Sequence, residues 1–214
     1  GGRGDYELRD LPDDVRAYVA GEIDKMVTNH ERKAGKPPRH GPWYGIKAPV
    51  SMLLLPFFGE RYGAWKFVHV VRDGRDIAFS GNVSPVRKFY DVSDVPDDGA
   101  GMEVKQIRLW SEWNSDVHEW CVREKEMGRG KFDFLVVKLE DFVDPDTRYK
   151  VVEKVADFVG SPLSHRDRCC ASKKGQRDLG SHSNTGLSLT KRYGKWRKKV
   201  EGRDGLREEL EREG

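Results

Sequence analysis

Apolar positions along this 214-residue chain follow two different spacings, and each spacing predicts one kind of element. Spacing of three or four residues predicts amphipathic helices over residues 12–27, 102–127, 147–159 and from 205 onward. A Leu-rich run predicts a short buried helix over 50–58. Compact runs of β-branched and aromatic residues predict strands over 67–71 and 131–138, the first of them buried on both faces.

Strands separated by helical segments predict an α/β fold, with a mainly parallel sheet and helices on both of its faces. The length suits one such domain over residues 1–214. Two polar stretches interrupt the pattern. Residues 81–101, rich in Gly, Pro and Asp, predict a long loop, and residues 161–190 are too polar to form a core of their own.

The strand over 67–71 is followed directly by residues that favour anion binding. Asp73 is the expected N-cap of a helix that starts at Arg75 and continues past Ser80. Free backbone N–H groups and the positive helix end meet at such a junction. Arg72 adds a planar charged fork suited to phosphate, and Ser80, about two turns into the helix, returns its hydroxyl to the same anion.

The charge balance predicts a local anion site rather than a nucleic-acid surface. The chain has 39 Lys and Arg against 36 Asp and Glu, a net charge of +3, so no specific nucleic-acid partner is expected. Six basic residues gather at 191–199, around Gly194 and Trp196. There Trp196 either anchors the segment apolarly or stacks on a base. Three cysteines match neither a disulfide framework nor a metal site, and no apolar run approaches the ~20 residues of a membrane span.

The segment VVRDGRDIAFS resembles the 3′-phosphate-binding segment of sulfotransferases that use 3′-phosphoadenosine 5′-phosphosulfate (PAPS). In that family an Arg at a strand end and a Ser eight residues later hold the 3′-phosphate, which implies this role for Arg72 and Ser80. Lys47 ends an expected strand over 44–47 and is followed two residues later by Pro49, which resembles the family's Lys-x-Pro element. That resemblance implies a catalytic Lys47, whose ammonium neutralises charge on the bridging oxygen as sulfuryl leaves.

The basic cluster resembles the family's C-terminal nucleotide-closing loop, expected here within residues 160–199. Gly194-Lys195-Trp196 matches the end of that loop, which implies nucleotide contacts from Gly194 and Lys195. Arg192, beside Lys191, substitutes for the loop's Arg-Lys-Gly part and is the third contact expected there.

Together these resemblances imply a sulfotransferase-like domain with a P-loop NTPase-like three-layer fold. Such a domain transfers the sulfuryl group of PAPS to an acceptor hydroxyl of a protein tyrosine, a carbohydrate or a small molecule, and leaves 3′,5′-ADP without using a metal. The Lys-x-Pro and Gly-Lys-Trp elements favour the tyrosylprotein or bacterial-type branches. No Gly/Ser/Thr-rich 5′-phosphosulfate loop occurs upstream of Lys47. We therefore expect an N-terminally truncated domain, which by itself would bind nucleotide weakly and catalyse nothing.

Two functions of other classes stay open. A non-catalytic anion-binding module for sulfated glycan, nucleotide or nucleic acid would use the 191–199 cluster without needing Arg72 and Ser80. A P-loop phosphotransferase would need a G-x-x-x-x-G-K-[ST] loop, which this sequence lacks. The sequence leaves open the acceptor, the general base (His40 is the nearest histidine to Lys47) and the oligomeric state. It also leaves open the compartment, either the cytoplasm or the Golgi lumen with an anchor outside this chain.

Overall fold

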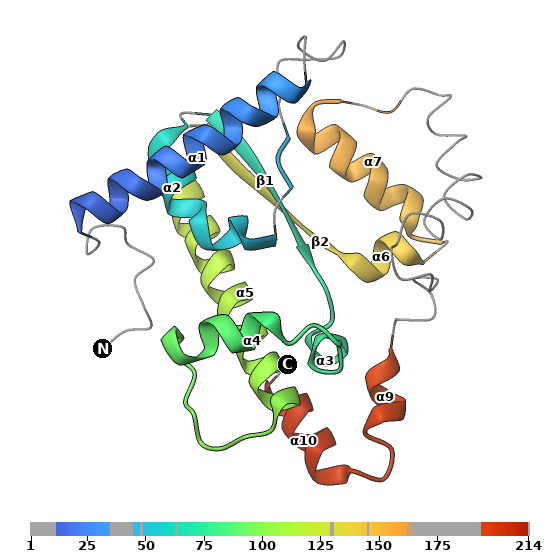
Figure 1. The fold of residues 1–214 in the computed structure, drawn as a ribbon. Coiled ribbons are helices and arrows are strands. Elements are labelled where there is room, and N and C mark those ends of the chain that lie inside the picture. Colours follow the sequence, from blue (N-terminus) through green and yellow to red (C-terminus); the bar gives the residue numbers. More distant parts are fainter. Residues whose placement is uncertain are drawn as a thin grey trace. The chain divides into compact units, whose positions relative to one another are not determined.

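The fold is mixed α/β and mostly helical, with a two-stranded parallel sheet of β1 and β2 packed against helices (Figure 1). The computed structural model describes residues 12–34, 45–47, 49–62, 64–128, 131–144, 146–161, 163 and 194–213. In chain order the elements are α1 (Asp13–Ala34), η2 (Pro49–Leu54), α2 (Leu55–Arg61), β1 (Ala64–Val71), α3 (Gly74–Ala78), α4 (Ser84–Phe89), η3 (Tyr90–Val92), α5 (Met102–Met127), β2 (Lys131–Lys138), α6 (Leu139–Val143), α7 (Arg148–Val159), α9 (Lys195–Lys199) and α10 (Asp204–Glu213).

The long periodic segments are where the sequence predictions are confirmed. Helix α5 and strand β2 have the predicted bounds, and α1, α7 and α10 begin within one residue of the predicted starts. The Leu-rich run is helical, as predicted, and buries Leu55 and Phe57. A strong hydrophobic periodicity over many residues therefore predicted the positions of these elements correctly.

Three local predictions are wrong. Residues 45–47 have no regular structure, so no strand ends at Lys47; Gly45 is poorly suited to a strand, and Pro49 starts the 3-10 helix η2. The segment 81–101 is not one long loop, because Pro85 in the first turn supports α4 and η3 follows it. Strand β1 is not buried on both faces, since Val70 is 51% exposed and Val136 of its only described partner strand is 37% exposed.

By its internal contacts the chain divides into two compact units, and each is described by itself. The first unit is made of Gly1–Phe67, Asp116–Phe134 and Val159–Ser161. The second is made of Val68–Ser115, Leu135–Phe158 and Pro162–Gly214.

The first unit has an aromatic core. Trp120 of α5 packs with Trp65 of β1 and Phe132 of β2, and the Trp65 and Phe132 rings are 4.6 Å apart. Cys121 is buried in the same cluster, and this burial raises the pKa of its thiol to about 12. A second cluster joins Ile23 of α1 to Phe57 of α2. Aromatic and aliphatic burial thus holds this unit together.

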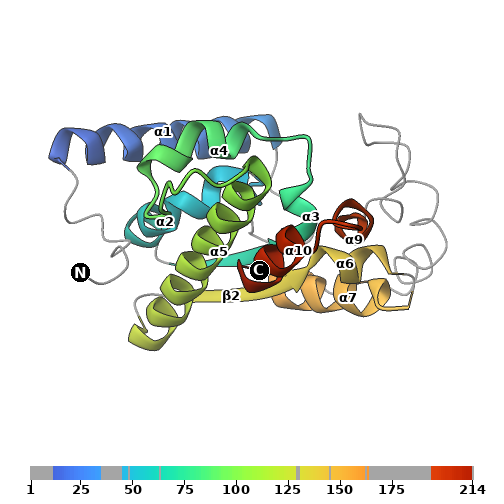
Figure 2. The same cartoon turned by 90° about the horizontal axis from the view of Figure 1, so that it is seen from below.

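The second unit has its main core where the C-terminal helices meet α3 and the beginning of α5. Figures 1 and 2 both draw α9 beside α3. The buried residues of this cluster are Ala78, Ile107, Trp196, Val200 and Leu210. They come from α3, α5 and the C-terminal segment, so this core packs the C-terminal segment against α3, the helix that follows β1 in the sequence.

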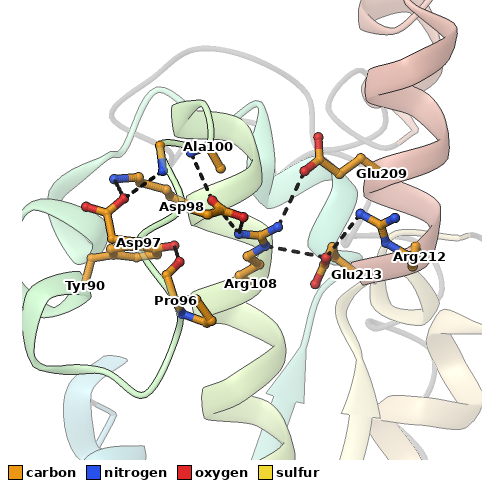
Figure 3. A network of polar contacts seen from close by, with 11 residues as sticks. Tyr90, Pro96, Asp97, Asp98, Ala100, Arg108, Glu209, Arg212 and Glu213 are labelled. Carbon is orange, nitrogen blue, oxygen red and sulfur yellow. Dashed lines mark hydrogen bonds and ion pairs between the residues drawn. The ribbon is translucent and has the colours of Figure 1, made fainter.

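A charged network in the second unit fastens the loop before α5 to α10 (Figure 3). Arg108 of α5 donates to both carboxylate oxygens of Asp98, each at 3.0 Å, and also pairs with Glu209 and Glu213 of α10 at 3.5 Å. The hydrogen bond from Arg108 holds the pKa of Asp98 below its usual value. One half-buried guanidinium therefore connects three parts of this unit.

The Gly74 position allows a close approach between α3 and α5. A Cβ at this position would lie 2.8 Å from Cδ2 of Trp110. We predict that Gly74→Ala lowers the free energy of unfolding by about 1–3 kcal/mol, because the indole must shift within a packed core. Urea unfolding measures this loss. Gly81→Ala is the matched control, since nothing lies within 4 Å of its Cβ. Equal stability of the two variants would contradict the packing argument.

Candidate functional site

The predicted anion site lies at the C-terminal end of β1, in the second unit. Strand β1 ends at Val71, and the Arg72 side chain, 28% exposed, follows it. Asp73 is the N-cap of α3, as predicted, because its carboxylate accepts from the Arg75 backbone N–H at 2.9 Å. The same carboxylate accepts from Nε and Nη2 of the Arg75 guanidinium at 2.9 and 2.8 Å. Arg75 is therefore committed to Asp73.

The protein itself occupies the backbone donors of this turn. The Asp73 N–H donates to Oε1 of Glu140 at 2.8 Å, and the Asp76 and Ile77 N–H groups both donate to the Asp73 carbonyl. The Arg75 N–H, as described, is held by the Asp73 side chain. The expectation that free N–H groups at this turn would bind an anion is thus wrong for these four donors. Because these four donors are occupied, the predicted anion contact at this turn rests on side chains such as Arg72.

Helix α3 is shorter than predicted, which changes the setting of Ser80. The helix ends at Ala78 after five residues, so Ser80 lies beyond it instead of two turns into it. The cause is Gln106 of α5, whose side-chain amide donates to the Ala78 carbonyl at 2.8 Å and so satisfies the helix end. The Ser80 hydroxyl donates to Oε1 of Gln106 at 3.3 Å. Sequence reasoning missed Gln106; its signal was a Gln between the inward-facing Val104 and Ile107.

Asp76 joins the two segments that the sequence predicted to hold one nucleotide. Its side chain is buried, and its carboxylate accepts from the backbone N–H groups of Gly194 at 2.8 Å and Trp196 at 3.2 Å. These donors lie 118 and 120 positions away along the chain. Nη2 of Arg72 is 3.9 Å from the same carboxylate. Asp76 thus provides the N-terminal cap of α9 from another element, because the N-cap residue Gly194 has no side chain.

The described part of the closing segment begins with a turn that only a glycine adopts easily. Gly194 has φ +69°, and α9 follows it. Trp196 is 3% exposed and packs into the core of the second unit. Its ring centroid lies 4.4 Å from the Arg75 guanidinium and 5.2 Å from that of Arg197. Of the two roles predicted for Trp196, apolar anchoring is correct, and base stacking is wrong because the ring is buried.

The remaining predicted residues have different outcomes. Lys195 is exposed on α9, and Arg192 and His40 lie outside the described residues. Lys47 belongs to the first unit, where its side chain is exposed. Arg72, Ser80, Gly194 and Lys195 all belong to the second unit. Their nucleotide contacts and the catalytic role of Lys47 stay predictions.

The lowered pKa of Asp73 shows how Arg75 is held at this turn. Burial raises the pKa of Asp73, but hydrogen bonds from Arg75 and the charges of Arg75 and Arg197 outweigh it, so the pKa is lowered overall. The stability that ionised Asp73 contributes is therefore present at neutral pH and is lost as the pH falls through its folded-state pKa. Because Asp73 stays ionised at neutral pH, it keeps Arg75 engaged. Arg72, whose side chain is 28% exposed and lies 3.9 Å from the Asp76 carboxylate, is the arginine for which the phosphate contact is predicted.

Within the ranges described, no group of His, Cys, Asp and Glu is suited to hold a metal ion. None of the helices that the structure describes is long and apolar enough to span a bilayer. No protein-family model matches the chain, and no curated protein or solved structure is significantly similar to it.

The hydrogen bonds that Asp76 accepts should contribute to the stability of the folded chain. We expect Asp76→Ala to lower the free energy of unfolding by about 2–4 kcal/mol, because two hydrogen bonds to a buried carboxylate are lost and the backbone N–H of Trp196 is left buried without an acceptor. Urea unfolding monitored by circular dichroism measures the change. Asp157→Ala, at an exposed position of α7, is the control and should change stability by no more than about 0.5 kcal/mol. A loss no larger than this at Asp76 would refute the cap.

Proposed function

We propose that this chain is a PAPS-dependent sulfotransferase domain whose second unit holds the 3′-phosphate of the nucleotide. One observation carries the proposal. Residues 72–80 and 194–196 each resemble a nucleotide-binding segment of that family, and the carboxylate of Asp76 hydrogen bonds the second segment to the first. Chance likeness in two short motifs gives no reason for the motifs to meet in space. We also propose that the parallel pair β1 and β2 belongs to a three-layer, P-loop NTPase-like fold within a single domain.

Each proposed site residue makes a different contact with the nucleotide. The Arg72 fork donates two parallel hydrogen bonds to the 3′-phosphate. The Ser80 hydroxyl turns from Gln106 to the phosphate, while Gln106 keeps its bond to the Ala78 carbonyl. The exposed ammonium of Lys195 adds a second positive contact, and Arg192 is proposed as a further one. These contacts recognise the nucleotide by a phosphate that ATP lacks.

Charge neutralisation drives the proposed chemistry. Sulfuryl transfer needs the acceptor oxygen, the sulfur and the bridging oxygen in line, and negative charge develops on the bridging oxygen. Lys47 is the proposed catalytic residue that stabilises this charge. The products are a sulfate ester on a protein tyrosine, a carbohydrate or a small molecule, and 3′,5′-ADP. Because the sequence has no Gly/Ser/Thr-rich phosphate loop upstream of Lys47, binding of 3′,5′-ADP is a more direct test than turnover.

A non-catalytic anion-binding module is the second candidate, and one observation favours it. Lys195, Arg197, Lys198 and Lys199 are all exposed on the five-residue helix α9. Such a cluster attracts polyanions without a shaped pocket, and its affinity falls steeply with salt. This candidate requires nothing of Arg72 or Ser80.

The first candidate predicts a strong dependence on Arg72. We expect 3′,5′-ADP to bind to the wild-type chain, and Arg72→Ala to weaken that affinity by about tenfold or more, because a bidentate charged contact is removed. Isothermal titration calorimetry at fixed salt measures both. Arg87→Ala, at an exposed position of α4, is the matched control and should leave the affinity unchanged.

Heparin binding distinguishes the second candidate. If heparin binds with a steep salt dependence, Lys198→Ala with Lys199→Ala weakens that binding, and 3′,5′-ADP is not bound, the module is the correct function. If 3′,5′-ADP binds with the same affinity in Arg72→Ala as in the wild type, the sulfotransferase site is wrong.

A further inference from the structure

The carboxylate of Asp76 is placed between the two parts of the proposed nucleotide site. It lies 3.9 Å from Arg72 and accepts hydrogen bonds from the N–H groups of Gly194 and Trp196. Only 3% of the residue is exposed, so water does not replace these partners. The position of the closing segment is therefore tied to the turn that carries Arg72.

Lys195 is fixed by its neighbours. It is the one residue between the two N–H donors that Asp76 holds, and its own side chain is exposed. Burial of Trp196 prevents the segment from sliding along α3, and Gly194, at φ +69°, sets the direction in which the chain enters α9. The backbone at Lys195 is thus held on both sides while its ammonium stays available.

We propose that Asp76 is a positioning residue for the nucleotide: its buried carboxylate holds Lys195 where the ammonium and the Arg72 guanidinium meet the same 3′-phosphate. The proposal rests on the proposed function and adds a residue that touches no substrate. A shared carboxylate makes the two contacts interdependent, since displacing the closing segment from Asp76 also removes Lys195 from the site.

A residue that only stabilises the fold behaves differently. Losing such a residue lowers the melting temperature, but each binding contact keeps its own contribution in the molecules that remain folded. A positioning residue instead makes the contribution of Lys195 depend on Asp76. The two cases are separated by whether the losses of binding free energy caused by changing Asp76 and Lys195 add up, as a structural role predicts, or do not, as a positioning role predicts.

The test is a double-mutant cycle on the affinity for 3′,5′-ADP, measured well below the melting temperature of each variant. Lys195→Ala should weaken binding about tenfold in the wild-type background and less than about twofold in Asp76→Asn, because the two N–H groups reach different carboxylate oxygens and an amide replaces one of these oxygens with an NH₂ donor. Asp73→Asn is the matched control background, since it removes a charge from the same turn but leaves the contacts to Gly194 and Trp196 in place. There the effect of Lys195→Ala should stay about tenfold.

Each outcome has one meaning. If Lys195→Ala weakens binding equally in the Asp76→Asn and wild-type backgrounds, the positioning role is overturned. The same holds if the effect of Lys195→Ala is reduced as much in the Asp73→Asn background as in Asp76→Asn. If Arg72→Ala leaves the affinity unchanged or 3′,5′-ADP is not bound, the proposed function itself fails and the positioning role fails with it. Weaker binding in Arg72→Ala together with an additive cycle rejects the positioning role alone.

Hydrogen exchange keeps the proposal testable if Asp76→Asn does not fold. In the wild-type chain, 3′,5′-ADP should slow amide exchange at Gly194 and Trp196 by about fivefold or more, because nucleotide held by Lys195 stabilises the segment against opening. In Lys195→Ala at saturating nucleotide this slowing should disappear. Unchanged exchange in the wild type, or full slowing in the variant, would overturn the role of Asp76.

Discussion

A buried carboxylate without hydrogen-bonding partners is strongly unfavourable, and this constraint explains how the C-terminal helices join the second unit. Asp76 is satisfied because the N–H groups of Gly194 and Trp196 reach it from the far end of the sequence. Trp196 then adds its ring to a core with Ile107 and Leu210. One buried carboxylate thereby holds the beginning of α9, and the apolar surface around it makes the arrangement stable.

The turn around Asp76 leaves little backbone for a ligand. Asp73 caps α3 and holds Arg75, and Glu140 takes the Asp73 N–H at the end of the neighbouring strand. Because the donors of Asp73, Arg75, Asp76 and Ile77 serve the protein itself, an anion bound here is recognised by side chains. In the site that we propose, Arg72 and Lys195 decide specificity, and rigid support from the turn lowers the entropy lost when they bind.

Sequence reasoning succeeded where the signal was local and repeated, and failed where a distant partner decided the outcome. The periodicity of α5 and β2 gave their bounds, and Asp73 was recognised as a cap because its partner is two residues away. The early end of α3 depends on Gln106, and the role of Asp76 depends on Gly194 and Trp196. Nothing in the pattern around residue 76 indicates a contact 118 positions away, so no propensity or motif predicts it.

The most direct measurement is an experimental structure of the chain crystallised with 3′,5′-ADP. The account predicts that the 3′-phosphate lies within hydrogen-bonding distance of the Arg72 guanidinium and the Ser80 hydroxyl, with the Ser80 hydroxyl turned away from Gln106 and Asp76 still bonded to Gly194 and Trp196. A nucleotide held only by the exposed basic side chains of α9, with Arg72 and Ser80 unchanged, would contradict it.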